Sequence, residues 1–275
     1  MKSYDMNHSM VIESYGVPVR LASTSVELFS ALAPLLDANL PGWKKVNGRA
    51  VAEHEFQYRW NASGLDSVYK DGLRLDVRRK RDSALAMLAS QIRMCIAEFA
   101  PEHIFIHAGA VCIDGVGVIL PARSMHGKTT LTAELVRQGA VYYSDEYAVI
   151  GLDGLVYPFP KSLSMRGILE GRAQVDIPVE QFGGKQGDEP VRIGLVVVTE
   201  YKERSRWRPK TLSVGEAFLE VIKHTVPIRR NTAVVIPTLT SVLEKAVIIK
   251  SFRSEAPKTA ESIIKLAREI STSNR

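Results

Sequence analysis

The feature that most constrains this chain is an apolar strand that leads through a short polar loop directly into a helix. Residues 115–122, GVGVILPA, are rich in β-branched and small side chains, and the loop after them ends in Gly-Lys-Thr at 127–129. Residues 129–138 have leucine at helical spacing, and Gly139 stands where a C-cap glycine is expected. Backbone N–H groups and a helix N-terminus face an anion at such a junction, so the sequence predicts a phosphate loop.

The loop departs from the usual pattern because Ala122 replaces its first glycine and the interior has no second one. In a working loop the lysine reaches the terminal phosphates of a nucleoside triphosphate, and the next hydroxyl holds magnesium. The alternative is a Gly-Lys helix start that binds no ligand. The predicted nucleotide-binding residues are Ala122, Arg123, Ser124, Met125, His126, Gly127, Lys128, Thr129 and Thr130.

The segment after this helix, VYYSDEYAVIGL at 141–152, resumes strand character. Strand, loop, helix and strand in this order predict a βαβ-like unit, whose two strands end at the same edge of the sheet. This geometry places Asp145 near Lys128. Asp145 and Glu146 are candidates to hold magnesium together with Thr129, or to accept a proton from an attacking hydroxyl. Either carboxylate can instead cap the following turn.

Two regions meet near residue 100. The first alternates short apolar runs with turn signals, which predicts small strands and one helix interrupted near Pro34, and it has no chemical motif. It closes with a linking helix that we expect Asp82 or Ser83 to cap. The second region contains the phosphate loop. Its further strand and helix candidates are residues 104–113, 192–201, 213–225, 246–253 and 257–271.

Composition excludes several classes of protein. With 275 residues, 45% hydrophobic and 24% charged, the chain is typical of globular proteins. The N-terminus, MKSYDMNHSM, has no signal-peptide character, and no segment approaches the roughly 18 apolar residues that span a bilayer. The two cysteines, Cys95 and Cys112, have no metal-ligand spacing. We therefore expect a cytoplasmic protein without a membrane partner.

The formal net charge of +6 favours anionic partners. Two basic clusters stand out, which we interpret as solvated surface. Nucleic-acid binding ranks last among the functions considered, because neither cluster lies in a recognisable binding motif. The clusters are Arg78, Arg79, Lys80 and Arg81, and then Lys202, Arg204, Arg206 and Arg208 around Trp207.

Four segments follow one another along the chain: IHAGAV with His107, the loop ARSMHGKTT, SDE at 144–146 and LSMRG at 163–167. Their order resembles that of the HPr kinase/phosphorylase family. In that family a histidine-glycine strand, a phosphate loop, a paired aspartate and a Glu-x-Arg-Gly segment surround ATP, magnesium and the serine that is phosphorylated. The resemblance covers residues 103–170 well and the rest of the C-terminal part more loosely.

The resemblance implies an α/β fold for residues 101–275, a P-loop domain with a mixed β-sheet like the C-terminal domain of that family. The first hundred residues do not share the resemblance, and their own pattern predicts a smaller α+β region over residues 1–100 that includes the linking helix. The resemblance also implies roles for matching residues. Lys128 would bind the β and γ phosphates of ATP, and Thr129 would bind Mg²⁺. Asp145 would be the base. His107 would lie beside the reacting phosphate, and Arg166 would neutralise charge on the transferred group.

Three positions differ from the family pattern. Ala108 replaces the glycine after the histidine, Glu146 the second aspartate, and Ser164 the glutamate two residues before the arginine. The site therefore lacks one family carboxylate, which implies reduced or altered metal dependence.

The predicted function is ATP-dependent phosphoryl transfer to a hydroxyl, on serine or threonine of a peptide or protein, or on a metabolite. The alternative is a nucleotide-binding regulator or assembly partner that has lost transfer chemistry. The family often forms symmetric hexamers, which leaves a homo-oligomer open.

Overall fold

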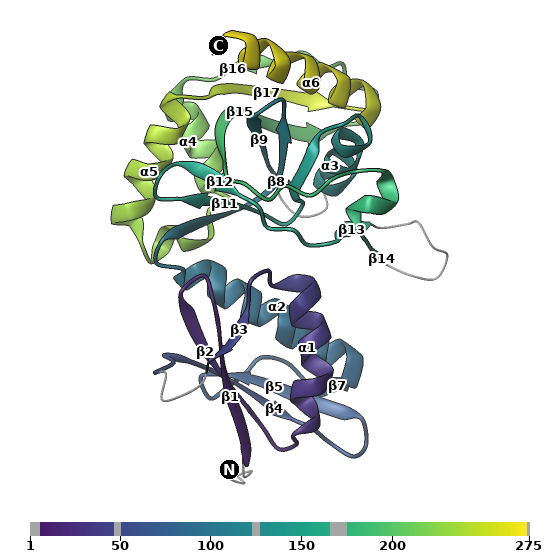
Figure 1. The fold of residues 1–275 in the computed structure, drawn as a ribbon, viewed down its shortest axis with the longest axis vertical. Coiled ribbons are helices and arrows are strands. Elements are labelled where there is room, and N and C mark those ends of the chain that lie inside the picture. The colour runs from purple at the N-terminus through teal and green to yellow at the C-terminus, as the bar shows by residue number, and fades with distance from the viewer. Residues whose placement is uncertain (1–5, 47–50, 123–126, 166–174, 274–275) are drawn as a thin grey trace. The chain divides into compact units, whose positions relative to one another are not determined.

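The structure is a computed structural model that describes residues 6–46, 51–122, 127–165 and 175–273. It divides into two compact units, Met1–Glu102 and His103–Arg275. Helices and strands occur together in each unit (Figure 1). This content confirms the predicted α/β class.

The N-terminal unit combines one sheet with two helices. Its strands run in the order β3-β1-β2-β4-β5-β6, with β7 paired to β5, and only β2 and β4 pair in parallel. The helices α1 and α2 pack against each other. The elements are β1 (His8–Ser14), β2 (Val17–Ser23), α1 (Glu27–Asn39), β3 (Lys44–Val46), β4 (His54–Arg59), β5 (Leu65–Lys70), β6 (Leu73–Arg74), β7 (Arg79–Lys80) and α2 (Arg81–Phe99).

Helix α1 continues through Pro34, so the predicted interruption is wrong. A proline in a helix removes one backbone hydrogen bond. Here Leu28, Leu32 and Leu36 are almost fully buried on one face, and their burial outweighs that loss.

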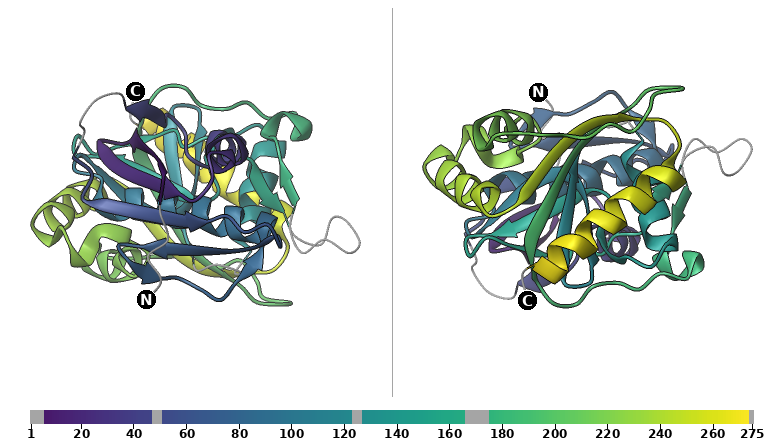
Figure 2. Two further views of the ribbon diagram at one scale, coloured as in Figure 1. Left: turned by 90° about the horizontal axis from the view of Figure 1, so that it is seen from below. Right: turned by 90° about the horizontal axis from the view of Figure 1, so that it is seen from above.

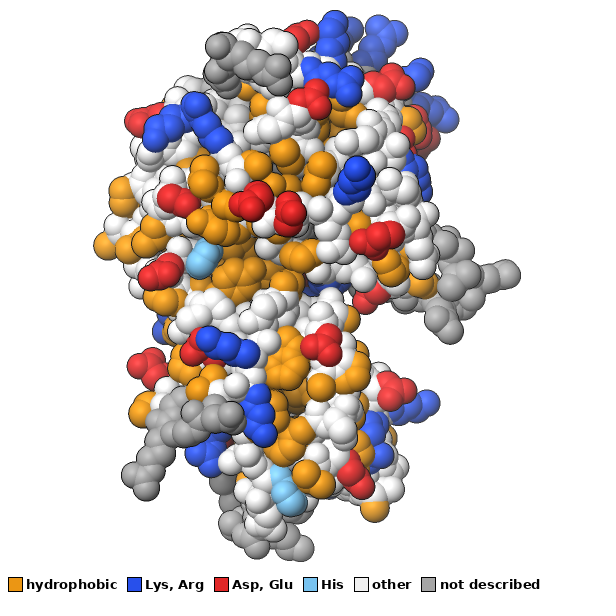
Figure 3. Space-filling view, viewed as in Figure 1, with side chains coloured by type: hydrophobic (Ala, Val, Ile, Leu, Met, Phe, Trp, Pro, Cys, Tyr) orange, Lys and Arg blue, Asp and Glu red, His pale blue; other side chains and the backbone are white. Residues whose placement is uncertain are grey.

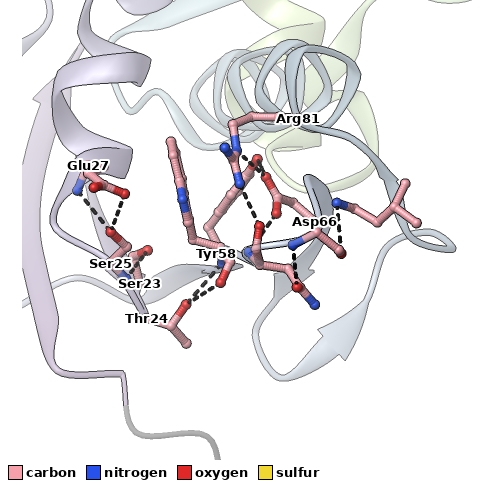
Figure 4. A network of polar contacts seen from close by, with 11 residues as sticks. Ser23, Thr24, Ser25, Glu27, Tyr58, Asp66 and Arg81 are labelled. Carbon is pink, nitrogen blue, oxygen red and sulfur yellow. Dashed lines mark hydrogen bonds and ion pairs between the residues drawn. The ribbon is translucent and has the colours of Figure 1, made fainter.

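The start of α2 is held by a buried carboxylate (Figure 4). Asp66 is fully buried, accepts from Tyr58 Oη at 2.8 Å and pairs with Arg81 Nε at 2.9 Å. The Arg81 guanidinium also lies 3.9 Å from the centre of the Trp60 ring. The helix begins at Arg81, which these contacts hold in place. Its N-cap is Lys80 and no side chain caps it, so the predicted cap at Asp82 or Ser83 is wrong.

The C-terminal unit is built on a mixed sheet with helices on both faces. The strand order is β10-β8-β11-β12-β15-β17-β16, and β9 pairs with both β8 and β15. The helices α3 and α6 cover one apolar cluster, and α4 and α5 cover another. In the view from above, α6 lies across the strands (Figure 2). Within the described residues, no helix is long and apolar enough to cross a membrane.

The elements of this unit are β8 (His103–Ile113), β9 (Val116–Pro121), α3 (Lys128–Arg137), β10 (Val141–Ser144), β11 (Tyr147–Gly151), β12 (Leu155–Tyr157), β13 (Leu163–Met165), β14 (Val175–Ile177), β15 (Val191–Tyr201), β16 (Lys210–Thr211), α4 (Val214–Ile222), α5 (Thr232–Glu244), β17 (Val247–Arg253) and α6 (Ala256–Ser273). Two short 3₁₀ helices cover Val179–Phe182 and Val226–Arg229.

Strand β8 organises the elements around the predicted phosphate loop. Asp114 and Gly115, both with positive φ, turn it into β9, as the sequence predicts. Both β9 and β10 are antiparallel to β8, so they are parallel to each other, as a βαβ-like unit requires. The predicted single strand at 141–152 is instead two strands, β10 and β11, separated by Asp145 and Glu146. Because both strands pair with β8, this gap faces the middle of β8.

Three strands of this sheet, β9, β15 and β17, are parallel. They end at Pro121, Tyr201 and Arg253, so these residues lie at one edge of the sheet. Ligands of open α/β sheets commonly bind at the carboxyl ends of parallel strands. This edge therefore holds the candidate site.

Candidate functional site

Helix α3 begins immediately after the predicted phosphate loop. Gly127 is its N-cap and has a left-handed backbone with φ of 76°. At the other end, Gly139 and Ala140 donate to Val136 and Leu135, which closes the helix as the sequence predicts. Ala122 is buried just after β9, Thr129 is half-buried, and Thr130 is exposed. The predicted loop residues Arg123, Ser124, Met125 and His126 lie outside the described residues.

Lys128 is the first residue of α3 and only 9% of its surface is exposed. Burial lowers the pKa of its amine from the ordinary 10.5 to about 8. The carboxylates of Glu146 and Asp145 oppose this shift, and the Lys161 charge adds to it. The sequence placed Asp145 near Lys128, and the structure brings both carboxylates within electrostatic range of the amine.

His107 lies on β8 between Lys128 and the Asp145-Glu146 gap. Its Nδ1 is 2.8 Å from the Glu146 carbonyl oxygen and 3.2 Å from Lys128 Nζ. A carbonyl oxygen only accepts, so the first contact places a hydrogen on Nδ1. In the second contact the same Nδ1–H can donate to Lys128 Nζ only if the amine is neutral, because an ammonium has no lone pair. The pKa of about 8 keeps this neutral amine accessible just above neutral pH.

The Asp145 carboxylate is held from two sides. Only 3% of the residue is exposed. Tyr142 Oη donates to Oδ1 at 3.1 Å, and the Ser164 backbone N–H donates to Oδ2 at 3.2 Å. The Tyr142 hydroxyl also lies 2.6 Å from the Lys161 carbonyl oxygen, while burial and Asp145 raise its pKa. These contacts fix the carboxylate in one orientation.

At Ser164, where the resembling family has glutamate, a small polar cluster is present instead. Ser164 Oγ accepts from Lys161 Nζ at 2.5 Å and donates to Asp176 Oδ1 at 2.6 Å. Lys161 is buried, and its Nζ is 3.8 Å from the same carboxylate oxygen. No sequence motif marked Lys161 or Asp176. Asp176 reaches the cluster through the pairing of β13 with β14, whereas Lys161 lies three residues before Ser164.

The metal-ligand prediction names Thr129, Asp145 and Glu146. Within the described residues, no three histidine, cysteine, aspartate or glutamate side chains cluster as metal ligands. Magnesium takes oxygen donors and commonly uses one or two carboxylates together with phosphate oxygens and waters. Two carboxylates and a hydroxyl fit that chemistry. Arg166, the predicted charge-neutralising residue, lies outside the described residues.

Arg253 is a residue that the sequence did not single out. It ends β17 and only 2% of its surface is exposed. Its Nη2 donates to the Gly127 carbonyl oxygen at 2.7 Å, and a Cβ at Gly127 would collide with that nitrogen. Burial lowers the guanidinium pKa, although Tyr201 and Glu255 partly oppose this. Its one available signal was its position at the carboxyl end of a predicted strand, since ligands gather at such ends.

Comparison with known proteins gives a sequence relative and a structural neighbour. HPr kinase/phosphorylase from Clostridium novyi (strain NT) is 30% identical over 154 residues, which cover 51% of this chain and 48% of the relative. The chain thus spans about half the length of the curated relative that it matches. No family model matches.

The structural neighbour is the HPr(Ser) kinase/phosphatase from Coxiella burnetii. It has 15% sequence identity and a TM-score of 0.33, and the match covers 60% of this chain and 95% of that one. That score is too low to support an inference about fold or function. The chain is thus similar over half its length to an HPr kinase/phosphorylase, and the order of motifs from His107 to Ser164 agrees with this similarity.

Proposed function

We propose that this chain is an ATP-dependent kinase that transfers the γ-phosphoryl group to a hydroxyl. The acceptor is a serine or threonine of a peptide or protein, or a metabolite. The observation that carries the proposal is the buried Lys128 at the N-terminus of α3, next to His107 and within electrostatic range of Asp145. Burying an amine costs stability, and an anionic ligand at a helix N-terminus would offset that cost.

Each residue has a role in this proposal. Lys128 and the first N–H groups of α3 bind the β and γ phosphates of ATP. Asp145 accepts the proton of the attacking hydroxyl at a carboxylate lone pair that its two present hydrogen bonds leave unused. His107 lies beside the transferred group, and Arg166 neutralises charge that develops on it.

Magnesium would be held by Thr129, Asp145 and Glu146, and when bound it would neutralise charge on the β and γ phosphates. The buried free thiols of Cys95 and Cys112 are compatible with the reducing, cytoplasmic setting that we propose for this activity.

A nucleotide-binding regulator without transfer activity is the second candidate. It is favoured by the hydrogen bonds that occupy both Asp145 oxygens, and by Ser164, which brings a hydroxyl where the family has a carboxylate. Such a regulator would bind ATP but would neither release phosphate nor label an acceptor.

The first test is calorimetric titration with a non-hydrolysable ATP analogue and magnesium. The wild-type chain should bind, and Lys128→Ala should bind at least about tenfold more weakly because it loses the cation at the phosphates. Lys265→Ala, at an exposed position on α6, is the matched control and should bind like wild type. Equal binding by wild type and Lys128→Ala, or no binding by either, would refute the nucleotide site.

A further inference from the structure

A ladder of basic side chains follows the end of β15. Lysine or arginine occupies every second position, and we call these five residues the basic ladder: Lys202, Arg204, Arg206, Arg208 and Lys210. Between them Trp207 is half-buried and packs against the apolar cluster under α3 and α6, while Arg206 and Arg208 are exposed. Residues 202–205 form a turn, with Arg204 at a φ of 58°, and the part from Arg206 to β16 contains no further turn. Arg206 and Arg208 flank Trp207 in this part and face away from the apolar cluster.

The backbone of the ladder is fixed to β17. The Lys202 N–H donates to the Arg253 carbonyl oxygen at 2.8 Å, and the Arg208 N–H donates to Ser251 Oγ at 3.0 Å. Lys210 then pairs with Lys250 in the short antiparallel strand β16, which is the last in the sheet order. The ladder is therefore a defined edge of the sheet. Basic side chains gather on the side of this unit where β17 ends (Figure 3).

The ladder lines a pocket of about 1010 Å³. The other walls come from the carboxyl ends of β9, β15 and β17 and from the end of α4. Pro121 and Ala122, where the predicted phosphate loop begins, are part of the lining. A molecule in this pocket would therefore border the proposed phosphoryl-transfer site.

The pocket has more positive charge than its own carboxylates neutralise. Glu220 pairs with Lys223 at 3.2 Å and with Lys250 at 2.9 Å, and Glu203 pairs with Arg204 at 3.4 Å. Within the described ranges, the other four ladder residues form no ion pair with a carboxylate: Lys202, Arg206, Arg208 and Lys210.

Two hydroxyls of the pocket residues also have unused hydrogen-bonding capacity. Thr199 Oγ1 and Ser205 Oγ are shielded from solvent and have no hydrogen-bond partner among the described residues. Buried polar atoms are usually paired in folded proteins. The excess of cations in the pocket carries the inference of an anionic ligand, and the two shielded hydroxyls add nothing to it.

We propose that this pocket binds an extended acidic segment of the phosphoryl acceptor, so that the acceptor is a peptide or protein. Aspartate or glutamate at alternate positions of that segment pairs with Arg206, Arg208 and Lys210, which follow the turn and repeat every two residues. The open edge at β16 also offers backbone groups to an added strand. The proposal rests on the kinase function above, because it places the acceptor hydroxyl next to the γ-phosphate.

The test is fluorescence anisotropy without nucleotide, using a labelled peptide with glutamate at every second position around one serine. The variant Arg206→Glu/Arg208→Glu should bind this peptide at least about tenfold more weakly than wild type, because attraction becomes repulsion. The control variant Lys245→Glu/Lys265→Glu changes the net charge equally at exposed positions outside the pocket lining, and should bind like wild type. Wild-type affinity should fall with added salt, and a glutamine version of the peptide should not bind.

Equal binding of the acidic peptide by wild type and by the Arg206→Glu/Arg208→Glu variant would overturn the proposal. The proposal would also fail if the Arg206→Glu/Arg208→Glu variant still bound the peptide but no longer bound the ATP analogue. The pocket would then be the nucleotide site. Retained peptide binding in a wild-type chain that does not bind the ATP analogue would refute the kinase function while supporting the acidic-peptide site.

Discussion

Lys128 is a cation that the fold keeps out of water. Its pKa in the folded chain, about 8, lies below the ordinary value of 10.5. Between these two pH values the unfolded chain therefore binds more protons than the folded one, and the stability of the fold rises with pH. Below pH 8 the whole cost of burying the charge is present. A residue retained at such a cost is typical of a binding site rather than of a structural core.

The first prediction concerns the pH dependence of nucleotide binding. Below pH 8 the Lys128 ammonium is charged and ready for phosphate, so affinity for the ATP analogue should change little down to about pH 7. Above pH 8 binding must first protonate the amine, and affinity should fall by up to about tenfold per pH unit. Titration calorimetry between pH 7 and pH 9.5 measures this slope. Lys128→Ala should lack it, and an identical slope in that variant would contradict the assignment.

A second prediction separates binding from transfer at Asp145. Asp145→Asn should still bind the ATP analogue, because in the proposed complex the phosphates contact Lys128 and the start of α3. Phosphoryl transfer should fall at least about a hundredfold, because an amide cannot accept the proton. The measurement is transfer of labelled phosphate to the acceptor or to water. Asp188→Asn, at an exposed carboxylate of the same unit, should keep full activity. A loss of less than about tenfold in Asp145→Asn would make the carboxylate structural.

At the scale of elements, the close packing of α3 on β8 sets the position of Lys128. Gly109 on β8 leaves no room for a side chain, because a Cβ there would collide with Thr132 Oγ1 and lie 3.5 Å from Lys128 Cγ. The strand therefore has a flat surface on which the first two turns of the helix rest. A larger residue at this point would displace the helix that begins the candidate site.

Gly109→Ala should accordingly destabilise the C-terminal unit by about 1–3 kcal/mol, the usual cost of overpacking. Gly215→Ala in α4 is the matched control, since nothing lies within 4 Å of its new methyl group. That variant should be neutral or more stable, because alanine restricts the unfolded chain. Denaturant unfolding measures both changes. A Gly109→Ala variant as stable as wild type would show that α3 moves freely against β8.

At the scale of the whole molecule, short-range sequence patterns predicted the elements around the site. They did not predict contacts between residues far apart in the chain. The β8–β9 hairpin and the glycine end of α3 follow from local turn and capping rules, and the structure confirms both. The contact of Arg253 with Gly127 joins segments far apart in the chain, which no periodicity encodes. Lys161 lies only three residues from Ser164, but no motif marks it, and its pairing with Asp176 depends on the separate strand β14. The roles assigned to His107, Asp145 and Arg166 stay predictions.

Strand β8 pairs with three strands that border the candidate site. It contains His107, it pairs with β9 ahead of Lys128, and it pairs with β10 and β11 on either side of Asp145. Its amides should therefore be among the slowest in the chain to exchange with solvent deuterium. We therefore expect the candidate site to unfold together with β8. On heating, nucleotide binding should be lost at the same temperature at which the β8 amides lose their protection from hydrogen exchange.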